Sequence, residues 1–149
     1  MQDIYAPFFR TGNRVIIMDT KSAEMTKYAA NSFLATKISF MNEFANLCEK
    51  VGADAEMVRI GISTDSRIGN KFLFPGLGYG GSCFPKDVKA LIKIASENGC
   101  KMKIIKAADD INKKQRQLFI DKITKKFGKN LKGKTFGVWG LALNQKQIV

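Results

Sequence analysis

Apolar positions recur at helical spacing over most of this 149-residue chain. Residues 22–51 form the longest uninterrupted element, with no Gly or Pro before Gly52, and Glu24 is placed to be an acidic residue in the first turn of a helix there. The apolar residues make two adjacent stripes: Leu34, Ile38, Met41, Ala45 and Cys48 in the first, and Phe33, Phe40, Phe44, Leu47 and Val51 in the second. A helix that is apolar over so wide an arc is buried on more than one side. We therefore expect the spine helix of a helical domain, which either is buried within the chain or also supplies a subunit interface.

Start and stop signals predict three more helices, over residues 54–60, 85–98 and 103–127. Asp54 can cap the first, and Pro85 suits the first position of the second. Gly99 and Gly128 stop the second and the third. Residues 63–70 are polar and turn-like. The predicted fold class is therefore mainly α.

The two ends of the chain differ in character from this centre. Residues 1–20 contain the aromatic segment YAPFFRTGN and a β-rich run, RVIIMD, and are predicted to connect into a helical domain over residues 21–128. Residues 129–149 begin with a polar turn, and TFGVWGLA within them is typical of a buried strand followed by a glycine turn. Because a lone strand cannot form a sheet, we expect these residues to begin an α/β domain that is cut short.

Composition and charge exclude some classes of protein. With 45% hydrophobic and 26% charged residues the chain matches an ordinary globular protein, and no run approaches the roughly 18 apolar residues of a membrane span. No signal peptide is recognisable, so we expect a cytoplasmic protein without a membrane partner. The net charge of +12 fits nucleic acid, an anionic ligand or a solvated basic surface. The lysines of the second half recur at helical intervals on a polar face, and we expect no exposed aromatics between them and recognise no nucleic-acid motif. A solvated surface is therefore favoured, and no nucleic-acid partner is expected.

The chain has three cysteines and no histidine, which restricts its chemistry. An odd number of cysteines without C-x-x-C spacing argues against a disulfide framework and a thiolate zinc site, so no metal is expected. Without histidine, a general base must be a carboxylate, an amine or a water, and Ser-His and Cys-His nucleophile pairs are excluded. Cys48, on the first apolar stripe, and Cys100, just past a helix end, are interpreted as small buried hydrophobes.

A glycine-rich segment, GLGYGGSCFPKD at residues 76–87, separates the predicted helices. Its first six residues fit the dinucleotide pattern G-x-G-x-x-G. A true fingerprint also needs a strand directly before it, a helix opening from it, and an acidic residue about 20 positions later. Here FLFP precedes the pattern, the helix begins only after SCF, and Asp87 follows too closely. We interpret the match as coincidental.

The glycine-rich segment instead presents a candidate nucleophile, Cys83. Its glycines permit unusual backbone dihedrals and close approach by a ligand. With Pro85 in the first helical turn, Cys83 lies just outside a helix N-terminus, where partial positive charge and unpaired N–H groups favour a thiolate. Lys86 adds positive charge nearby. The alternative for Cys83 is a small buried hydrophobe.

These residues resemble a known family. GYGGSCFPKD, residues 78–87, resembles the active-site segment of UDP-glucose 6-dehydrogenases, within the wider UDP-glucose/GDP-mannose dehydrogenase family. AEMTKYAANSFLATKISFMNEFANLCEKVGAD (residues 23–54) and DSRIGNKFLFPG (residues 65–76) resemble the family's central helical domain. LKGKTFGVWGLA (residues 131–142) resembles the opening of its C-terminal nucleotide-sugar-binding domain. The resemblance covers nearly the whole chain, in the order that the family has.

The resemblance also implies what surrounds such a segment in the complete enzyme. The family's N-terminal Rossmann domain, which carries its NAD fingerprint, and most of its C-terminal domain have no counterpart here. After GLA the family usually continues FKPNTDD, with a lysine that approaches the substrate, whereas Leu143 and Asn144 stand here. We expect a truncated or frame-changed sequence that does not turn over by itself, because no domain binds the hydride acceptor.

The chemistry that the resemblance implies is oxidation of a sugar C6 alcohol to a carboxylate with two NAD, through a cysteine thiohemiacetal and a thioester that water hydrolyses. Cys83 then matches the nucleophile, and Asp87 the carboxylate that positions or deprotonates water. Lys27 and Asn31 match an oxyanion-stabilising pair, and their spacing of four places them on one helix face. Lys86 matches a cofactor contact. The pattern alone also allows other roles for these residues. Asp87 fits an acidic residue that stabilises the helix dipole at an N-terminus. Lys27 fits a surface charge, and Asn31 fits a tolerated polar residue.

The resemblance further implies a nucleotide-sugar substrate and a homodimer through the helix of residues 22–51. UDP-glucose is the expected substrate, for polysaccharide precursor synthesis, and GDP-mannose or a UDP-N-acetylhexosamine are the alternatives. Arg67 matches a substrate contact that the family delivers across its dimer interface. The substrate-binding residues implied are Lys27, Arg67, Phe72, Leu73, Phe74, Pro75, Gly76 and Gly80. By pattern alone, Arg67 is an exposed loop residue, Phe72 and Phe74 are core residues, and the chain could equally be a non-catalytic helical dimerisation module.

Overall fold

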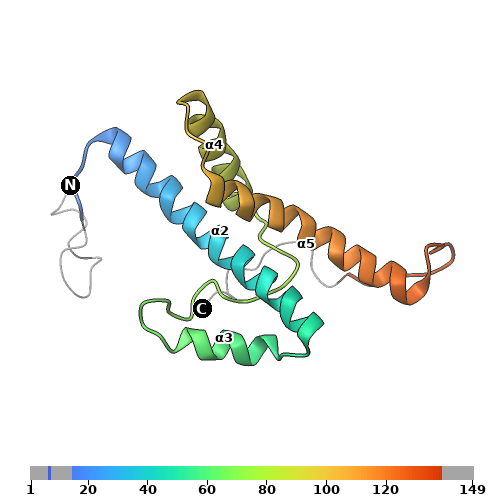
Figure 1. Ribbon diagram of the computed structural model, residues 1–149. Coiled ribbons are helices and arrows are strands. Elements are labelled where there is room, and N and C mark those ends of the chain that lie inside the picture. Colours follow the sequence, from blue (N-terminus) through green and yellow to red (C-terminus); the bar gives the residue numbers. More distant parts are fainter. Residues whose placement is uncertain (1–6, 8–14, 139–149) are drawn as a thin grey trace.

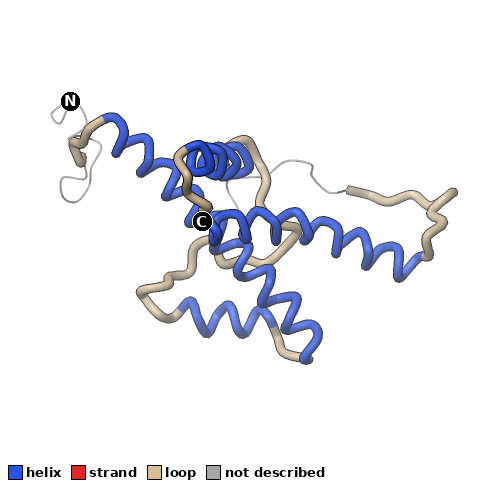
Figure 2. The backbone as a smooth tube through the Cα atoms, turned by 45° about the horizontal axis from the view of Figure 1, so that its top comes forward, coloured by secondary structure: helices blue, strands red, loops and turns tan. Residues whose placement is uncertain are grey.

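The computed structural model describes residue 7 and residues 15–138 of the chain. The described residues contain four helices and no strand (Figure 2): α2 (Thr20–Val51), α3 (Ala55–Ser63), α4 (Phe84–Glu97) and α5 (Lys103–Phe127). The prediction of a mainly α fold is confirmed. Residues 15–19, which belong to the β-rich run before the long helix, form no strand and end in Asp19, the N-cap of α2.

Helix α2 is the spine of the molecule and packs against each of the other helices. Figure 1 shows α4 and α5 on one side of α2 and α3 on the other. The helix begins at Thr20 because the Asp19 carboxylate accepts the N–H of Ser22 at 3.0 Å. This early start leaves the first turn without an acidic residue, so the prediction for Glu24 is wrong. Gly52 ends the helix with a left-handed φ of 76°.

The termini of the other helices follow local signals in the sequence. Asp54 accepts two backbone N–H groups at 2.8 and 3.2 Å as the N-cap of α3, which extends to Ser63 rather than ending at the predicted residue. In α4, Cys83 is the N-cap residue and Pro85 lies within the first two positions, and the helix ends at Glu97. The predicted bounds of α5, including its stop at Gly128, are confirmed.

The hydrophobic core lies where α2, α4 and the glycine-rich segment meet. Its centre is Ala35 of α2, Tyr79 of the segment and Val88 of α4. Half-buried apolar residues pack around this centre: Ile38, Phe84, Ile92 and Ile105. Because Tyr79 belongs to a loop, the core ties that loop to the helices.

The two apolar stripes of α2 have different environments. In the first stripe, Met41 and Cys48 are buried and the other members are half-buried. Every member of the second stripe is exposed, from 40% for Phe44 to 67% for Val51. Burial of the whole apolar arc within the described chain is therefore wrong, and the remaining alternative is that the second stripe supplies an interface.

The described chain beyond α5 is irregular. Residues 128–138 form no strand, and the rest of the strand expected at residues 135–142 lies outside the described residues. Most of the N-terminal segment predicted as a connection also lies outside them. The one ring contact here joins Phe127 to Phe136, edge to face, with centroids 5.6 Å apart.

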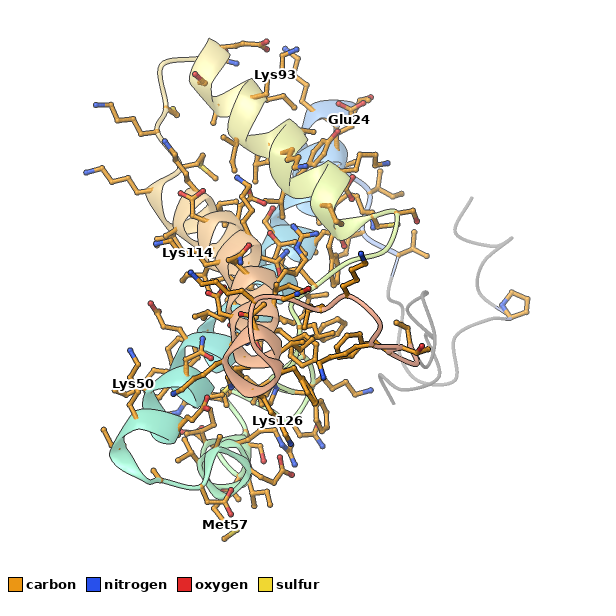
Figure 3. The ribbon with its side chains drawn as sticks, turned by 90° about the vertical axis from the view of Figure 1, so that its right-hand side faces the viewer. Glu24, Lys50, Met57, Lys93, Lys114 and Lys126 are labelled. Carbon is orange, nitrogen blue, oxygen red and sulfur yellow. The ribbon has the colours of Figure 1, made fainter. Side chains whose placement is uncertain are left out.

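The described basic residues of the second half lie on the surface. Lys114 and Lys126 are exposed along α5, and Lys93 is exposed on α4 (Figure 3). Across residues 15–138, none of the helices combines the length and hydropathy that a bilayer span requires.

Candidate active site

A loop that precedes α4 carries the glycine-rich segment. Phe72, Gly78 and Gly81 adopt positive φ angles of 62°, 105° and 78° along it. Within the described residues no strand precedes the G-x-G-x-x-G pattern, and α4 begins only after Cys83. The pattern therefore lacks the strand–turn–helix setting that holds a dinucleotide pyrophosphate.

Three side-chain amides hold the backbone of this loop at two residues. Asn42 of α2 accepts the N–H of Gly76 at 2.7 Å, and Gln115 of α5 donates to the C=O of the same residue at 2.8 Å. Asn112 of α5 accepts the N–H of Tyr79 at 2.7 Å and donates to its C=O at 3.0 Å. The bonds from Asn112 satisfy the N–H and C=O of Tyr79, which would otherwise be buried without partners.

The sequence pattern did not identify these anchoring amides. Asn42 and Asn112 are both buried, and each lies on the inward face of a helix that was predicted to be amphipathic. A polar residue at an inward helical position needs a buried hydrogen-bond partner, so its position in the sequence could have indicated an anchoring role. Which loop residue supplies the partner is not a local property of either helix.

Tyr79 connects the loop to a charged pair on α5. Its hydroxyl donates to Asp109 Oδ1 at 3.3 Å, and Asp109 Oδ2 lies 2.6 Å from Lys113 Nζ. Burial, and then the Asp109 carboxylate, raise the pKa of Tyr79 well above its ordinary value, while Arg116 acts weakly in the opposite direction. Hydrogen bonding to Asp109 raises the pKa of Lys113. Tyr79 therefore stays protonated and remains a donor to α5.

Cys83 lies at the mouth of α4. It is the N-cap residue, its side chain is exposed, and its Sγ lies 3.7 Å from Ser82 Oγ. The prediction that Cys83 lies at a helix N-terminus is confirmed, and the alternative of a buried hydrophobe is wrong. Among the other cysteines, the predicted burial is confirmed for Cys48 and wrong for Cys100, which is exposed just past α4.

Asp87 and Asn31 form a buried pair that joins α4 to α2. Their side chains are 5% and 6% exposed, and Asn31 Nδ2 donates to Asp87 Oδ2 at 2.5 Å. The backbone N–H of Asp87 donates to the C=O of Cys83 at 2.8 Å, so the carboxylate lies one turn from the N-cap. The structure thus brings three of the predicted catalytic residues to one corner of the molecule.

The two lysines predicted for the site are placed differently. Lys86 is exposed, and its Nζ lies 3.5 Å from Asp87 Oδ1. Lys27 lies one turn before Asn31 on α2, and its side chain is exposed. Lys27 has no hydrogen bond or ion pair to any described residue, so the structure places it near Asn31 along the helix without joining it to the pair.

The residues predicted to bind substrate divide into buried and exposed groups. Leu73 is buried, and Phe72 is half-buried with its ring 5.9 Å from that of Phe84. Phe74 is 55% exposed beneath the Arg59 guanidinium, which lies 4.3 Å from its ring centroid. Of the remaining residues, Pro75 and Gly80 are half-buried and Gly76 is held by the amides described above.

Arg67 lies apart from the Cys83 corner, in the turn after α3. Its side chain is 87% exposed and forms an ion pair with Asp65 at 2.6 Å. The same turn is held to α2 by Lys37, whose Nζ donates to the C=O of Ile68 at 2.9 Å. The structure therefore fixes the turn but leaves the guanidinium facing solvent.

Comparison with known proteins gives consistent matches over this region. The model of the UDP-glucose/GDP-mannose dehydrogenase family, central domain, matches residues 21–114. The UDP-glucose 6-dehydrogenase of Pseudomonas aeruginosa is 49% identical over 142 residues, which cover 95% of this chain and 31% of the relative. The UDP-glucose 6-dehydrogenase TuaD of Bacillus subtilis is 51% identical over 142 residues, covering 95% of this chain and 30% of that protein.

A solved structure shows the same arrangement of helices. The UDP-glucose dehydrogenase from the hyperthermophilic archaeon Pyrobaculum islandicum matches with a TM-score of 0.78 at 36% identity, over 85% of this chain and 28% of that one. The chain therefore spans about a third or less of the length of the proteins that it matches.

Proposed function

The chain belongs to the UDP-glucose/GDP-mannose dehydrogenase family, whose central domain it contains, and we propose that it is the catalytic segment of a UDP-glucose 6-dehydrogenase. The observation that carries the proposal is the corner where Cys83 caps α4 and Asp87, one turn later, is buried against Asn31. A thiol, a carboxylate and an amide at one helix mouth are the groups that covalent aldehyde oxidation needs.

In this proposal the chain's own residues act on the aldehyde carbon of the substrate. Cys83 Sγ bonds to C6 as the C=O double bond becomes a single bond. The proton that leaves the thiol ends on the former carbonyl oxygen, which becomes the hydroxyl group of a thiohemiacetal. Lys27 and Asn31 stabilise negative charge on that oxygen. Asn31 has two N–H groups, so it can serve the oxygen with one while the other remains on Asp87. Asp87 later orients or deprotonates the water that hydrolyses the thioester.

NAD would supply the hydride acceptor for both oxidations. Among the described residues, the one candidate contact for NAD is Lys86, which is exposed and reaches Asp87 Oδ1. The glycine-rich segment lacks the setting of a dinucleotide site and therefore does not fit the cofactor. We accordingly expect the 149-residue chain alone not to reduce NAD when UDP-glucose is added, and measurable reduction would contradict this.

Protection of Cys83 by the sugar tests the proposal on the chain itself. Iodoacetamide alkylation is followed at each cysteine by peptide mass spectrometry, with and without UDP-glucose. We expect UDP-glucose to slow alkylation of Cys83 several-fold and to leave Cys100 unchanged, because Cys100 is also exposed but lies outside the site. GDP-mannose and UDP-N-acetylglucosamine are the matched ligands that decide between the substrate alternatives.

The outcomes of this experiment are distinct. Equal protection of both cysteines, or of neither, would contradict the proposed function. Stronger protection by GDP-mannose or UDP-N-acetylglucosamine would assign the chain to a sister dehydrogenase. A stable dimer without protection by any of the three sugars would favour the non-catalytic dimerisation module.

We also propose that the partner of α2 is a second copy of this chain. The support is the second apolar stripe, whose members are all exposed, with the rings of Phe40 and Phe44 4.6 Å apart. Contiguous exposed apolar surface of this kind is typical of an interaction site. Arg67 faces solvent on its own chain, which suits the role of reaching the sugar site of the partner.

A further inference from the structure

We infer that Asn112 is a positioning residue, which sets the course of the loop that carries the substrate-contacting backbone and Cys83. The inference rests on the proposed function of that loop. Asn112 lies on α5 and is 4% exposed. Both ends of its amide bind one residue, since Oδ1 accepts the N–H of Tyr79 at 2.7 Å and Nδ2 donates to its C=O at 3.0 Å. One bond reaches the peptide unit before the Tyr79 Cα atom and the other reaches the peptide unit after it. Together they fix the orientation of the Tyr79 backbone as well as its position.

The residue before Tyr79 is shaped to admit this contact. Gly78 has a φ of 105°, which side chains of L-residues rarely permit. A Cβ atom at this position would collide with the Asn112 side chain. Gly78 and Asn112 are therefore complementary, because the missing side chain makes room for the amide that holds the next residue.

The contact is transmitted to the thiol through a short span. The ring of Tyr79 is buried in the core and meets the ring of Phe84 edge to face, with centroids 6.2 Å apart. Phe84 is the first residue of α4. Residues 80–83 thus join two fixed points, and Asn112 holds one of them. Removing Asn112 would free that end while leaving the Asn31–Asp87 pair in place.

Hydrogen exchange tests whether Asn112 holds the loop. In Asn112→Ala we expect exchange in peptides covering residues 76–83 to quicken by about tenfold or more, because Tyr79 loses both backbone partners. Exchange in α2 peptides should change far less. Gln117→Ala is the matched control, since it removes an exposed amide of the same helix whose bond is to Asp121 at 2.9 Å. Unchanged loop exchange, or an equal rise in α2, would overturn the inference.

Protection by UDP-glucose connects the loop to the proposed site. In Asn112→Ala we expect the concentration of UDP-glucose that halves Cys83 alkylation to rise by about tenfold, while the rate without sugar stays within about threefold. Retained protection together with a loosened loop would overturn the positioning role. If the unchanged chain shows no protection, the proposed function fails, and the exchange experiment still decides whether Asn112 holds the loop.

A second variant keeps the shape of the side chain and replaces its NH2 group by a carboxyl oxygen. In Asn112→Asp the introduced carboxyl group can accept and donate when neutral but can only accept when ionised. Because this position is buried, the neutral carboxyl group is favoured there up to a higher pH than in water. Loop exchange relative to the unchanged chain should therefore be closer to normal at about pH 5 than at about pH 8. The charged and titratable groups near Asn112 are Asp109, Lys113 and Arg116 of α5 and Tyr79 of the loop, and the two chains are compared at equal pH because both carry them. A ratio that does not depend on pH would contradict the donor role, even if Asn112→Ala does not fold.

Discussion

The two sides of α2 differ from those of an ordinary amphipathic helix in a globular protein. Its buried side includes polar residues: Asn31, Ser32, Ser39 and Asn42. Its exposed side carries large apolar residues: Phe33, Phe40, Phe44, Leu47 and Val51. Burying a polar group costs free energy unless the group finds a hydrogen-bond partner. An apolar side chain that stays exposed contributes no free energy of burial to folding. The difference indicates that neither side is arranged for the stability of the single chain alone.

The buried side of α2 serves as a template for the site. Asn31 binds Asp87 of α4, and Asn42 binds the backbone of the glycine-rich loop at Gly76. Ser39 Oγ donates to the C=O of Ala108 in α5 at 2.8 Å. Asn31, Ser39 and Asn42 thus each locate a different element. The second stripe instead remains exposed.

The largest effect should follow from placing charge on the exposed side. In the double variant Phe40→Asp and Phe44→Asp we expect the dimer dissociation constant, measured by sedimentation velocity, to rise by about a hundredfold or more, because aromatic residues dominate interface free energies. Lys21→Asp, which changes the net charge equally at an exposed position off the stripe, is the control. A monomeric unchanged chain, or a double variant that dimerises as tightly, would refute the interface.

A smaller effect on stability should distinguish the loss of a buried polar side chain on α2 from the loss of an exposed apolar side chain two positions away. In the Phe40→Asp and Phe44→Asp background, Asn31→Ala should lower the free energy of urea unfolding by about 1–3 kcal/mol, because the buried Asp87 carboxylate loses its donor. Phe33→Ser should change it by less than about 0.5 kcal/mol, because Phe33 is already exposed. The opposite order would show that α2 follows the ordinary pattern.

The smallest effect concerns two buried serines on α2. Ser39→Ala should cost about 1 kcal/mol of unfolding free energy, since it leaves the Ala108 carbonyl without its hydroxyl donor. Ser32 Oγ has no partner among the described residues, so Ser32→Ala should lie within about 0.5 kcal/mol of zero. Equal losses in the two variants, measured by urea unfolding, would contradict the template role of Ser39.

Local signals account for what was predicted well. Asp54 as an N-cap, Pro85 near the start of α4 and Gly128 at the end of α5 act within one or two turns, so the helices could be read from the chain. The error at Glu24 also has a local cause. Asp19 caps the helix and starts it at Thr20, two residues before the expected start. Cys100 was misplaced because its burial depends on what packs over the end of α4 and not on its neighbours in sequence.

The sequence by itself determined the four helices, the thiol at a helix N-terminus and an apolar arc on α2 that is too wide to be covered on one side only. Only the tertiary structure decided which groups meet. Asn31 and Asp87 are 56 positions apart, and Asn112 and Tyr79 are 33 apart. Helix signals arise from the backbone and its nearest side chains, whereas the partner of a buried amide depends on how whole elements pack. For that reason the position of Cys83, the proposed nucleophile, at a helix N-terminus could be predicted from its sequence neighbours, and the amides that hold its loop could not.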